Sequence, residues 1–575
     1  MKTKEYIVIL KDGTDYNQFW NDIENTSAGL PHIPDRAVAI LNNRDVQPRM
    51  CHYALTDDEA ELVKLDSRVA TVEEPLANIG LFPQLFTTEG PSTGNISFTI
   101  PAITNHSGNN VNWGLIAHST SNNTYGNTVS TSSEYQYTLD GTGVDIVIMD
   151  TGIEYYHPEF LDASGNTRVV LYNWTGNLVT TPNSINFSDI DGHGTACAGI
   201  SGGKNYGWAK NAAIYPCKIF DSGSISVADA LDAIKTWHTA KNTVGNVAYT
   251  GRSTVVNGSF GYVFGNALLS ITSINYQNGG NVAATTPDAS KGMTNGSVTQ
   301  YDLASGNTYL FSCGQPLRTS QIDTAVDALI SSGAVFVCAA GNDAHKIATP
   351  TDSSNKTNDY WNYWNGTYNG ISYSIDYRYY NRGASPGTAN AIVVGAMVAG
   401  TNGAGQNQKI SYSNAGYGVD VFAVGWNPRT AYANVVSGSG EYWLNTAYRQ
   451  KTFGGTSAAA PQIAGISALY LQAHPLANNL SGNNTAVIKS WLTQNSNTSA
   501  LYNSGLSSDY TNYQSQWGGN AGVAYQSIQG LTQVKGTGNT WQSPANVLIK
   551  TAANTWSTVN KVWTKTTANT WVQTY

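Results

Sequence analysis

Short apolar runs alternate with helical segments along the middle of this chain, and this alternation limits the folds that it can adopt. The run VDIVIMD at 144–150 has five apolar residues in seven, as in a strand buried on both faces of a sheet. The other predicted strands are 212–220, 254–261, 334–342 and 391–398, and the predicted helices are 321–333, 456–474 and 485–495. Strands that alternate with helices favour a parallel sheet covered by helices. We therefore predict an α/β fold with a mostly parallel sheet.

The composition argues against several classes of protein. Charged residues make up 12% of the 575 residues, about half of the usual share, and the net charge is −8, so no nucleic-acid partner is expected. The apolar run at 7–10 is shorter than the ~7–15 residues of a secretory signal. No run approaches the ~20 apolar residues that span a membrane, so neither a signal peptide nor a membrane span is predicted. An uncharged polar composition is nevertheless typical of proteins that work outside cells.

Composition also divides the chain into predicted parts. Residues 1–80 alternate short strands with two helices, and the second helix opens with a capping box of Thr56 and Glu59, so we predict a small α/β domain. Residues 81–110 are rich in Gly, Pro, Thr and Asn, which indicates a linker. The alternating region then covers 111–530 and forms the main predicted domain.

Two segments interrupt this main domain, at about 262–318 and about 346–383. Both are predicted to be long surface insertions, and loops of that length are often functional. The second is rich in Tyr and Trp. We expect these side chains to form the core of a folded loop, with a carbohydrate platform as the alternative.

The end of the chain repeats with a period of fifteen residues. The tripeptide Asn-Thr-Trp occurs at 539–541, 554–556 and 569–571. Trp and Val alternate with Thr, Lys and Ser around these turns, as in short β-hairpins. Residues 531–575 are therefore predicted to form a small separate β-repeat module.

The stretch FGGTSAAAPQIAG at 453–465 surrounds the hydroxyl of Ser457 with residues that have small side chains. Gly454 and Gly455 allow another backbone to approach closely, and Ser457 follows them in the first turn of a predicted helix. Its N–H and the positive helix end point at the same place, which suits a developing negative charge. Pro461 is expected in that first turn as well, where an N–H lacks an intrahelical partner anyway. Taken alone, the motif favours an N-capping serine on a packed Ala-rich helix.

Two other polar residues next to glycines change that interpretation. DGHGTACAG at 191–199 places His193 between two glycines at the start of a helix rich in small residues. Asp150 ends its predicted strand at the sheet edge where α/β proteins gather active groups, and a buried aspartate there needs a partner such as an imidazole N–H. A serine hydroxyl becomes a nucleophile when a histidine takes its proton and a carboxylate orients that histidine. We therefore predict that Asp150, His193 and Ser457 act together.

A side-chain amide completes this set of groups. FVCAAGND at 336–343 ends a predicted strand and places Asn342 directly after Gly341. An exposed amide there can donate a hydrogen bond to an oxyanion, together with the N–H of Ser457.

These motifs together resemble the subtilisin-like serine proteases, the subtilase or peptidase S8 family. The resemblance covers 111–530 apart from the two insertions, and its stretches stand in family order: VIMDTGI, DGHGTACAGI, NGSFG, AAGND and GGTSAAAPQIAGISALY. The proteinase K branch is the most similar, because NWGLIAHSTS at 112–121 resembles its mature N-terminus. Cys197 falls where that branch keeps a free cysteine beneath the catalytic histidine. The resemblance implies a three-layer subtilisin-like fold, with a propeptide-like domain before it and the β-repeat module after it.

Substrates of this family add as a strand to exposed edges of the enzyme. The resemblance places these edges at 221–226 and 257–261, with the residues around Asn342 beside them, and an ordinary turn and strand is the alternative. The predicted substrate-binding residues are Ser222, Gly223, Ser224, Ser259, Phe260, Gly261, Ala340, Gly341 and Asp343. Asp343 would bring negative charge near the pocket for the P1 residue, which favours basic P1 residues or disfavours acidic ones.

The resemblance also implies a structural calcium site, although no cofactor is expected to be required for catalysis. In the proteinase K branch the site uses main-chain carbonyls before a VGA motif and a carboxylate after an SN-x-G motif, which correspond here to Ala389, Ala391 and Asp420. The loop is one residue shorter than the family pattern, so a solvated loop carboxylate is the alternative for Asp420.

Residues 1–80 resemble the propeptide of the family, an inhibitor and folding assistant of its own catalytic domain. Such a propeptide threads its C-terminal tail through the active site until self-cleavage. We therefore predict an intramolecular inhibitor and a cut between about 75 and 112. A permanently attached α/β domain is the alternative, and the missing signal peptide favours it.

The predicted function is a self-processing serine endopeptidase that hydrolyses peptide bonds of polypeptide substrates. Ser457 attacks, His193 transfers the proton, Asp150 orients His193, and Asn342 holds the oxyanion with the Ser457 N–H. The alternative is a structural or attachment protein of a virion or other particle, because the Trp repeats resemble those of phage tail proteins. The chain is accordingly expected outside cells or on a virion, with a virion or cell-surface partner for the repeats.

Overall fold

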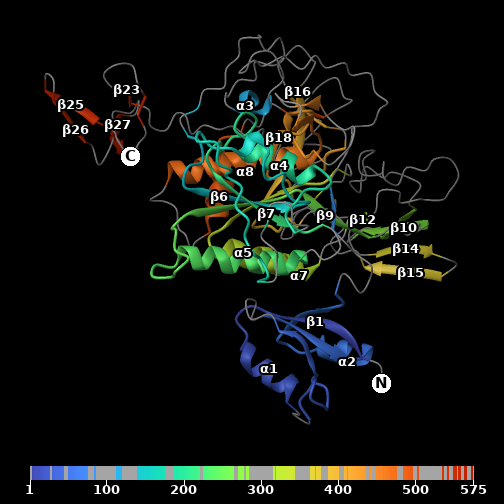
Figure 1. Ribbon diagram of the computed structural model, residues 1–575. Coiled ribbons are helices and arrows are strands. Elements are labelled where there is room, and N and C mark those ends of the chain that lie inside the picture. Colours follow the sequence, from blue (N-terminus) through green and yellow to red (C-terminus); the bar gives the residue numbers. More distant parts are fainter. Residues whose placement is uncertain are drawn as a thin grey trace.

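Figure 1 shows the computed structural model of the 575-residue chain. It describes residues 3–25, 29–43, 49–75, 83–85, 112–118, 137, 139–176, 181, 186–220, 225–264, 270–276, 280–283, 315–316, 319–342, 347, 363–368, 371–376, 386–399, 407–410, 412–416, 418–434, 441–442, 447–474, 483–496, 501–503, 534–535, 541–542, 548–552, 555–558, 563–565 and 571–573.

A small antiparallel sheet with two helices precedes the rest of the fold. Its strand order is β2–β3–β1–β4. The strands are β1 (Lys4–Leu10), β2 (Ile40–Asn43), β3 (Met50–Leu55) and β4 (Val69–Glu73), and the helices are α1 (Tyr16–Glu24) and α2 (Asp57–Val63). Helix α2 begins with the predicted capping box, in which Thr56 and Glu59 each accept a hydrogen bond from the backbone N–H of the other. Phe19 of α1 and Val63 of α2 pack with Val8 of β1 in a core separate from the main one.

The main sheet has the strand order β22–β17–β16–β13–β8–β6–β7, and β18 also pairs with β16. Every pair in it is parallel except β16 with β17. Its strands are β6 (Val144–Asp150), β7 (Ala213–Lys218), β8 (Ser253–Gly258), β13 (Val335–Ala339), β16 (Ile392–Ala399), β17 (Asn407–Lys409), β18 (Val421–Val424) and β22 (Leu501–Asn503). The predicted mostly parallel α/β sheet is therefore confirmed.

Helices cover both faces of this sheet, which gives three layers (Figure 1). One face carries α4 (His193–Gly202) and α8 (Thr456–Ala473), which pack on each other and on the central strands. The opposite face carries α5 (Val227–Asn242) and α7 (Ser320–Ser331). The other helices among the described residues are α3 (Gly114–Ala117), η3 (Pro158–Phe160) and α9 (Asn484–Gln494), of which α9 contacts β13. No helix of the described residues is long and apolar enough to cross a membrane.

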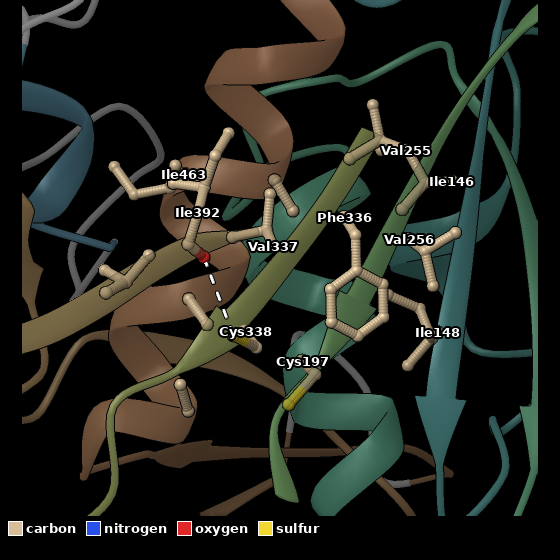
Figure 2. Packing of buried hydrophobic residues seen from close by; sticks show 14 of the residues in the cluster. Ile146, Ile148, Cys197, Val255, Val256, Phe336, Val337, Cys338, Ile392 and Ile463 are labelled. Carbon is tan, nitrogen blue, oxygen red and sulfur yellow. Dashed lines mark hydrogen bonds between the residues drawn. The ribbon is translucent and has the colours of Figure 1, made fainter. Parts of the chain in front are cut away.

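The centre of the sheet is buried over its whole length because its strands carry apolar, often β-branched residues on both faces. Figure 2 shows Ile146, Val255 and Val337 from three neighbouring strands in this packing. Cys197 of α4 and Ile463 of α8 are fully buried against the same core. The two helices that carry His193 and Ser457 are therefore fixed to one rigid sheet.

The two predicted insertions share one antiparallel sheet of order β11–β10–β14–β15. Strands β10 (Ser270–Tyr276) and β11 (Gly280–Ala283) come from the first insertion, and β14 (Tyr363–Tyr368) and β15 (Ile371–Asp376) come from the second. The pairing of β10 with β14 joins segments that the sequence analysis treated as separate irregular loops.

Two three-stranded and three two-stranded sheets are the other sheets of the described residues. Strand β9 (Phe260–Phe264) lies between β5 (Pro83–Leu85) and β12 (Gln315–Pro316), and β21 (Arg449–Thr452) lies between β19 (Arg429–Tyr432) and β20 (Glu441–Tyr442). Near the C-terminus, β23 (Val534–Lys535), β25 (Leu548–Ala552) and β27 (Trp563–Lys565) pair antiparallel with β24 (Trp541–Gln542), β26 (Thr555–Thr558) and β28 (Trp571–Gln573). These pairs agree with the predicted hairpins, and their status as a separate module stays a prediction.

Candidate active site

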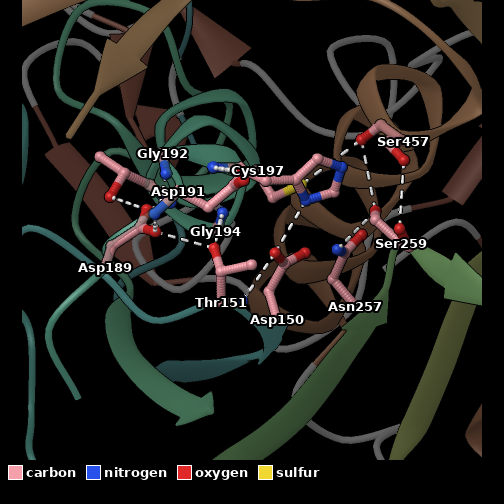
Figure 3. Close-up of polar contacts among 12 residues, drawn as sticks. Asp150, Thr151, Asp189, Asp191, Gly192, Gly194, Cys197, Asn257, Ser259 and Ser457 are labelled. Carbon is pink, nitrogen blue, oxygen red and sulfur yellow. Dashed lines mark hydrogen bonds and ion pairs between the residues drawn. The ribbon is translucent and has the colours of Figure 1, made fainter. Parts of the chain in front are cut away.

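Asp150, labelled in Figure 3, is the last residue of β6, and His193 is the first residue of α4. Their side chains meet at the carboxyl edge of the sheet. His193 Nδ1 lies 2.7 Å from Asp150 Oδ1, and both side chains are buried. Asp150 Oδ1 also accepts a hydrogen bond from the Thr151 N–H at 2.8 Å. A carboxylate at Nδ1 keeps the proton of the neutral imidazole there, so Nε2 is the nitrogen that can accept another proton.

The surroundings of His193 favour its protonated form. Burial opposes the charge, but the charge of Asp150 and its hydrogen bond to the imidazole outweigh burial and raise the pKa of His193 above its ordinary value. The imidazolium that would form on proton uptake is therefore stabilised, which is the electrostatic requirement for a general base in an acyl transfer.

The start of α4 depends on a glycine that no other residue could replace. Gly192 is the N-cap with φ of +103°, in the left-handed region. A Cβ on Gly192 would lie 2.4 Å from the ring of Tyr432, whose hydroxyl donates to the Asp191 carbonyl at 3.1 Å. The glycine before His193 thus allows a turn and a close contact at once.

Asp189 is a buried carboxylate that the sequence analysis missed. It accepts hydrogen bonds from the hydroxyl of Thr151, at 2.8 Å, and from the N–H groups of Gly192, at 2.8 Å, and Thr195, at 2.9 Å. Asp189 therefore ties the residue after Asp150 to the first turn of α4. The only local signal is an acidic residue before the DGHG motif, and nothing in the sequence distinguishes it from Asp191.

Ser457 is the second residue of α8, whose N-cap Gly455 has φ of +97°. The Ser457 hydroxyl donates to the Ser259 carbonyl at 3.1 Å (Figure 3). His193 Nε2 is buried and has no hydrogen-bond partner among the described residues. Asp150 and His193 are thus paired in the structure, while the Ser457 hydroxyl is directed to Ser259.

Pro461 does not lie in the first turn of its helix, as predicted, because α8 begins at Thr456 and Pro461 is in the second turn. There proline removes the N–H that would bond to the carbonyl four residues earlier, which belongs to Ser457. That carbonyl accepts from the Ser259 hydroxyl at 3.3 Å and from the Cys197 thiol at 3.5 Å. The proline therefore frees a carbonyl that links α8 to α4 and to the residue after β8.

Cys197 also belongs to a group of possible metal ligands. The ligand atoms of Asp150, His193 and Cys197 lie within 4.8 Å of one another, and Cys197 Sγ is 3.8 Å from His193 Nδ1. Burial, together with the charge of Asp150, raises the pKa of the thiol well above its ordinary value. The Cys197 thiol donates a hydrogen bond to the Ser457 carbonyl at 3.5 Å.

Asn342 is fixed by the first residue of α8. Its Oδ1 accepts from the N–H of Thr456 at 2.9 Å and from the hydroxyl of Thr456 at 2.8 Å. The Thr456 hydroxyl in turn accepts from the N–H of Gly341 at 3.1 Å. Because both contacts use the amide oxygen, the amide nitrogen is the donor side of Asn342.

The predicted substrate edge is only partly within the described residues. Ser259 lies between β8 and β9, Phe260 and Gly261 are the first two residues of β9, and β9 pairs antiparallel with β5 of this chain. The carbonyls of Ala340 and Gly341 accept from the side chain and backbone N–H of Asn414, at 2.8 and 2.9 Å. The other four predicted residues, Ser222, Gly223, Ser224 and Asp343, lie outside the described part of the chain.

The three predicted calcium ligands do converge, but on a lysine of this chain. Lys489 Nζ donates to the carbonyls of Ala389, at 2.9 Å, and Ala391, at 2.8 Å, and lies 2.8 Å from Asp420 Oδ1. Asp420 is therefore not the solvated loop carboxylate considered as the alternative. No local sequence signal points to Lys489, which follows Asp420 by 69 positions and lies on α9.

The sequence model of the subtilase family (Peptidase_S8) matches residues 141–515, and this chain belongs to that family. A cuticle-degrading serine protease of Arthrobotrys oligospora is 27% identical over 341 residues, which are 59% of this chain and 54% of that protein. A subtilisin-like serine protease of Cochliobolus lunatus is 25% identical over 450 residues, which are 74% of this chain and 66% of that protein. The chain spans about half to two thirds of the length of these curated relatives.

Among solved structures, a cold adapted subtilisin-like serine proteinase aligns with 72% of this chain and 98% of its own, at 22% identity and a TM-score of 0.41. Fervidolysin from Fervidobacterium pennivorans, described as a keratinolytic enzyme related to subtilisin, aligns with 95% of this chain and 62% of its own. Its identity is 15% and its TM-score is 0.48.

Proposed function

We propose that this chain is a serine endopeptidase that uses Asp150, His193 and Ser457 as its catalytic groups. The observation that carries the proposal is the buried hydrogen bond of 2.7 Å between His193 Nδ1 and Asp150 Oδ1, beside the start of the helix that bears Ser457. Membership of the subtilase family supports it. Hydrolysis of peptide bonds implies polypeptide substrates.

The reaction begins with a rotation of the Ser457 side chain. Its hydroxyl leaves the Ser259 carbonyl, to which it donates at 3.1 Å, and turns toward His193 Nε2. His193 takes the hydroxyl proton as the oxygen attacks the substrate carbonyl, and Asp150 stabilises the resulting imidazolium.

The oxyanion of the tetrahedral intermediate is held by two donors near the N-terminus of α8. They are the amide nitrogen of Asn342, oriented by Thr456, and the backbone N–H of Ser457. The N–H groups of a first helical turn lack intrahelical partners, so the Ser457 N–H is suited to this role. His193 then returns its proton to the leaving amine, and a water activated by His193 releases the acyl group from Ser457.

The N-terminal domain is proposed to inhibit this site within the same chain. Two observations support the proposal. Glu73, at the end of β4, accepts the N–H of Ser320 at 3.2 Å and so caps the N-terminus of α7. Further along, β5 lies antiparallel on β9, with Leu85 opposite Phe260 and Gln84 opposite Gly261. This is the strand addition expected of a peptide in the substrate edge.

The register of β5 on β9 narrows the position of the proposed self-cleavage. Because β5 and β9 are antiparallel, the chain that continues from Leu85 runs in the direction from Phe260 toward Ser259. The carbonyl of Ser259 accepts a hydrogen bond from the Ser457 hydroxyl. We therefore place the scissile bond within the first two residues after Leu85, inside the interval of 75 to 112 that the sequence predicts.

The proposal is tested by the intact mass of the full chain, for the wild type and Ser457→Ala, each with and without a fluorophosphonate probe. We expect a wild type shortened near Leu85 that takes up the probe, and a Ser457→Ala chain that does neither. A wild type that stays full length but takes up the probe would mean an active enzyme with a permanent N-terminal domain. A full-length, unlabelled wild type would contradict self-processing, and would mean that the site is either blocked by the N-terminal domain or used only as a scaffold.

The site of action is proposed to be extracellular. The alternative of a particle protein, with a partner for the repeats at 531–575, stays a prediction, because the contacts in the described residues do not bear on it. Detection of the chain in purified particles, or only as free enzyme, would decide between them.

A further inference from the structure

The oxygens expected to bind calcium surround the ammonium group of Lys489. A lysine ammonium has three N–H donors, and Nζ of Lys489 is 2.8–2.9 Å from three acceptors. The acceptors are the carbonyls of Ala389 and Ala391 and the Oδ1 of Asp420. Every donor of the ammonium is therefore used, and the distances are those of charge-assisted hydrogen bonds.

These residues do not fit a calcium ion while Lys489 is present. Calcium takes about 6–8 oxygen ligands at roughly 2.3–2.6 Å, and its affinity depends on the number of charged ligands. Here one carboxylate and two neutral carbonyls supply a single negative charge, which one ammonium balances. A calcium ion at the same point would meet the positive charge of Lys489 at contact distance.

The contacts of Lys489 join three separate parts of the fold. Lys489 lies on α9, Ala391 directly precedes β16, and Asp420 directly precedes β18. The second carboxylate oxygen of Asp420 accepts the N–H of Val393 at 2.8 Å, so both of its oxygens are engaged. The Asp420 side chain is 13% exposed and that of Lys489 is 25% exposed, so solvent screens this contact only in part.

The chain places lysine ammonium groups among main-chain carbonyls elsewhere as well. Lys210 Nζ donates to the carbonyls of Lys204, at 3.1 Å, and Gly207, at 2.8 Å. Lys409 Nζ donates to those of Ile410, at 2.8 Å, and Ser413, at 2.7 Å. One of the three acceptors around Lys489 is a carboxylate, which adds a negative charge to the two carbonyls.

We propose that Lys489 is a resident cation that takes the place of calcium between α9, β16 and β18. The oxygens of Ala389, Ala391 and Asp420 form a cage around this ammonium group. The chain itself supplies both the cage and its cation, so no metal is needed. Two consequences follow from the geometry. A chelator leaves the cage intact, and removal of the ammonium alone leaves three convergent oxygens that an added calcium ion can bind.

The test uses the full chain with Ser457→Ala, which prevents self-digestion and leaves the cage unchanged whether or not the chain is a protease. The variants are Lys489→Met, which keeps an apolar stem without the charge, Asp420→Asn, and the two together. Lys204→Met is the matched control, because Lys204 is an exposed lysine whose side chain takes no part in the cage. Thermal unfolding is measured with EDTA and with calcium at about 10 mM, roughly ten times the weakest Kd of typical extracellular sites.

We expect Lys489→Met to lower Tm in EDTA by roughly 2–4 °C, whereas Lys204→Met leaves it unchanged. Calcium should restore part of this loss in Lys489→Met and nothing in the double variant, which lacks the carboxylate. The proposal is overturned if Lys489→Met is as stable as the parent in EDTA, or if calcium does not raise its Tm. It is also overturned if the parent gains Tm from calcium and Asp420→Asn abolishes that gain, because the parent would then hold calcium in the cage.

Discussion

Replacement of Gly194 by alanine tests whether the pairing of His193 with Asp150 depends on close approach of α4 to the end of β6. Gly194 follows His193, and a Cβ built on it would lie 2.2 Å from the carbonyl oxygen of Gly152 and 3.1 Å from Asp150 Cβ. Carbon and carbonyl oxygen normally stay about 3.3 Å apart, so the helix must withdraw by about 1 Å. That movement would lengthen the 2.7 Å hydrogen bond between His193 and Asp150.

A displacement of this size is expected to lower kcat/KM about 10²-fold. Overpacking costs about 1–3 kcal/mol, offset by up to about 1 kcal/mol because alanine favours helix more than glycine does. Gly202→Ala on the same helix is the matched control, since its Cβ would meet the end of the flexible Ile214 side chain at 3.0 Å. We expect that variant to keep activity within about twofold, with the same gain in helix propensity.

The assay is hydrolysis of a peptide substrate by both variants, with unfolding in denaturant measured in parallel. Equal activity of Gly194→Ala and Gly202→Ala would refute the reasoning, because the carbonyl of Gly152 would then not limit the position of His193. If Gly194→Ala loses stability but keeps its activity, α4 accommodates the added methyl group by a movement that does not displace His193.

The triad and a buried ion pair allow three further predictions. Asp150→Asn should lower kcat about 10⁴-fold without unfolding the chain, because an amide can hold His193 in the wrong tautomer. Near-normal turnover would exclude an orienting role for Asp150. The pH profile of kcat/KM should rise with a midpoint above 6.5, because Asp150 raises the pKa of His193 and only the neutral imidazole accepts the serine proton; a midpoint below 6.5 would contradict this. Lys241→Met should lower the free energy of unfolding in denaturant by about 3 kcal/mol, because it leaves the buried Asp145 with Arg252 alone; a loss under about 1 kcal/mol would show that Arg252 suffices.

Much of the fold and most residues of the candidate active site were accessible from local sequence signals. The apolar run at 144–150 predicts a strand buried on both faces, and the structure has β6 there, ending at Asp150. Thr56 and Glu59 predict a helix start because a capping box involves residues only three positions apart. His193 and Ser457 were found because glycines stand beside them in the sequence. Gly192 and Gly455 adopt a positive φ, which glycine does more readily than other residues.

Contacts between distant segments left no such signal. Pro461 was expected in the first turn of α8 but lies in the second. The carbonyl that it frees accepts from the Cys197 thiol and the Ser259 hydroxyl, and these groups lie beside it only because of how α4 and β8 pack against α8. The two insertions were predicted as separate loops, but their strands β10 and β14 pair. The sequence does not predict this pairing, because it depends on which segments the fold brings side by side.

The sequence by itself determined the mostly parallel α/β sheet, the capping box at the start of α2 and the positions of His193 and Ser457 next to glycines, because these depend on neighbours within a few positions. The tertiary structure alone decided which cation faces Asp420. Only the packing of α9 beside β16 and β18 brings Lys489 to the oxygens of Ala389, Ala391 and Asp420. Carbonyl and carboxylate oxygens attract an ammonium as well as a calcium ion, so the oxygens predicted from the sequence do not identify which cation the fold supplies.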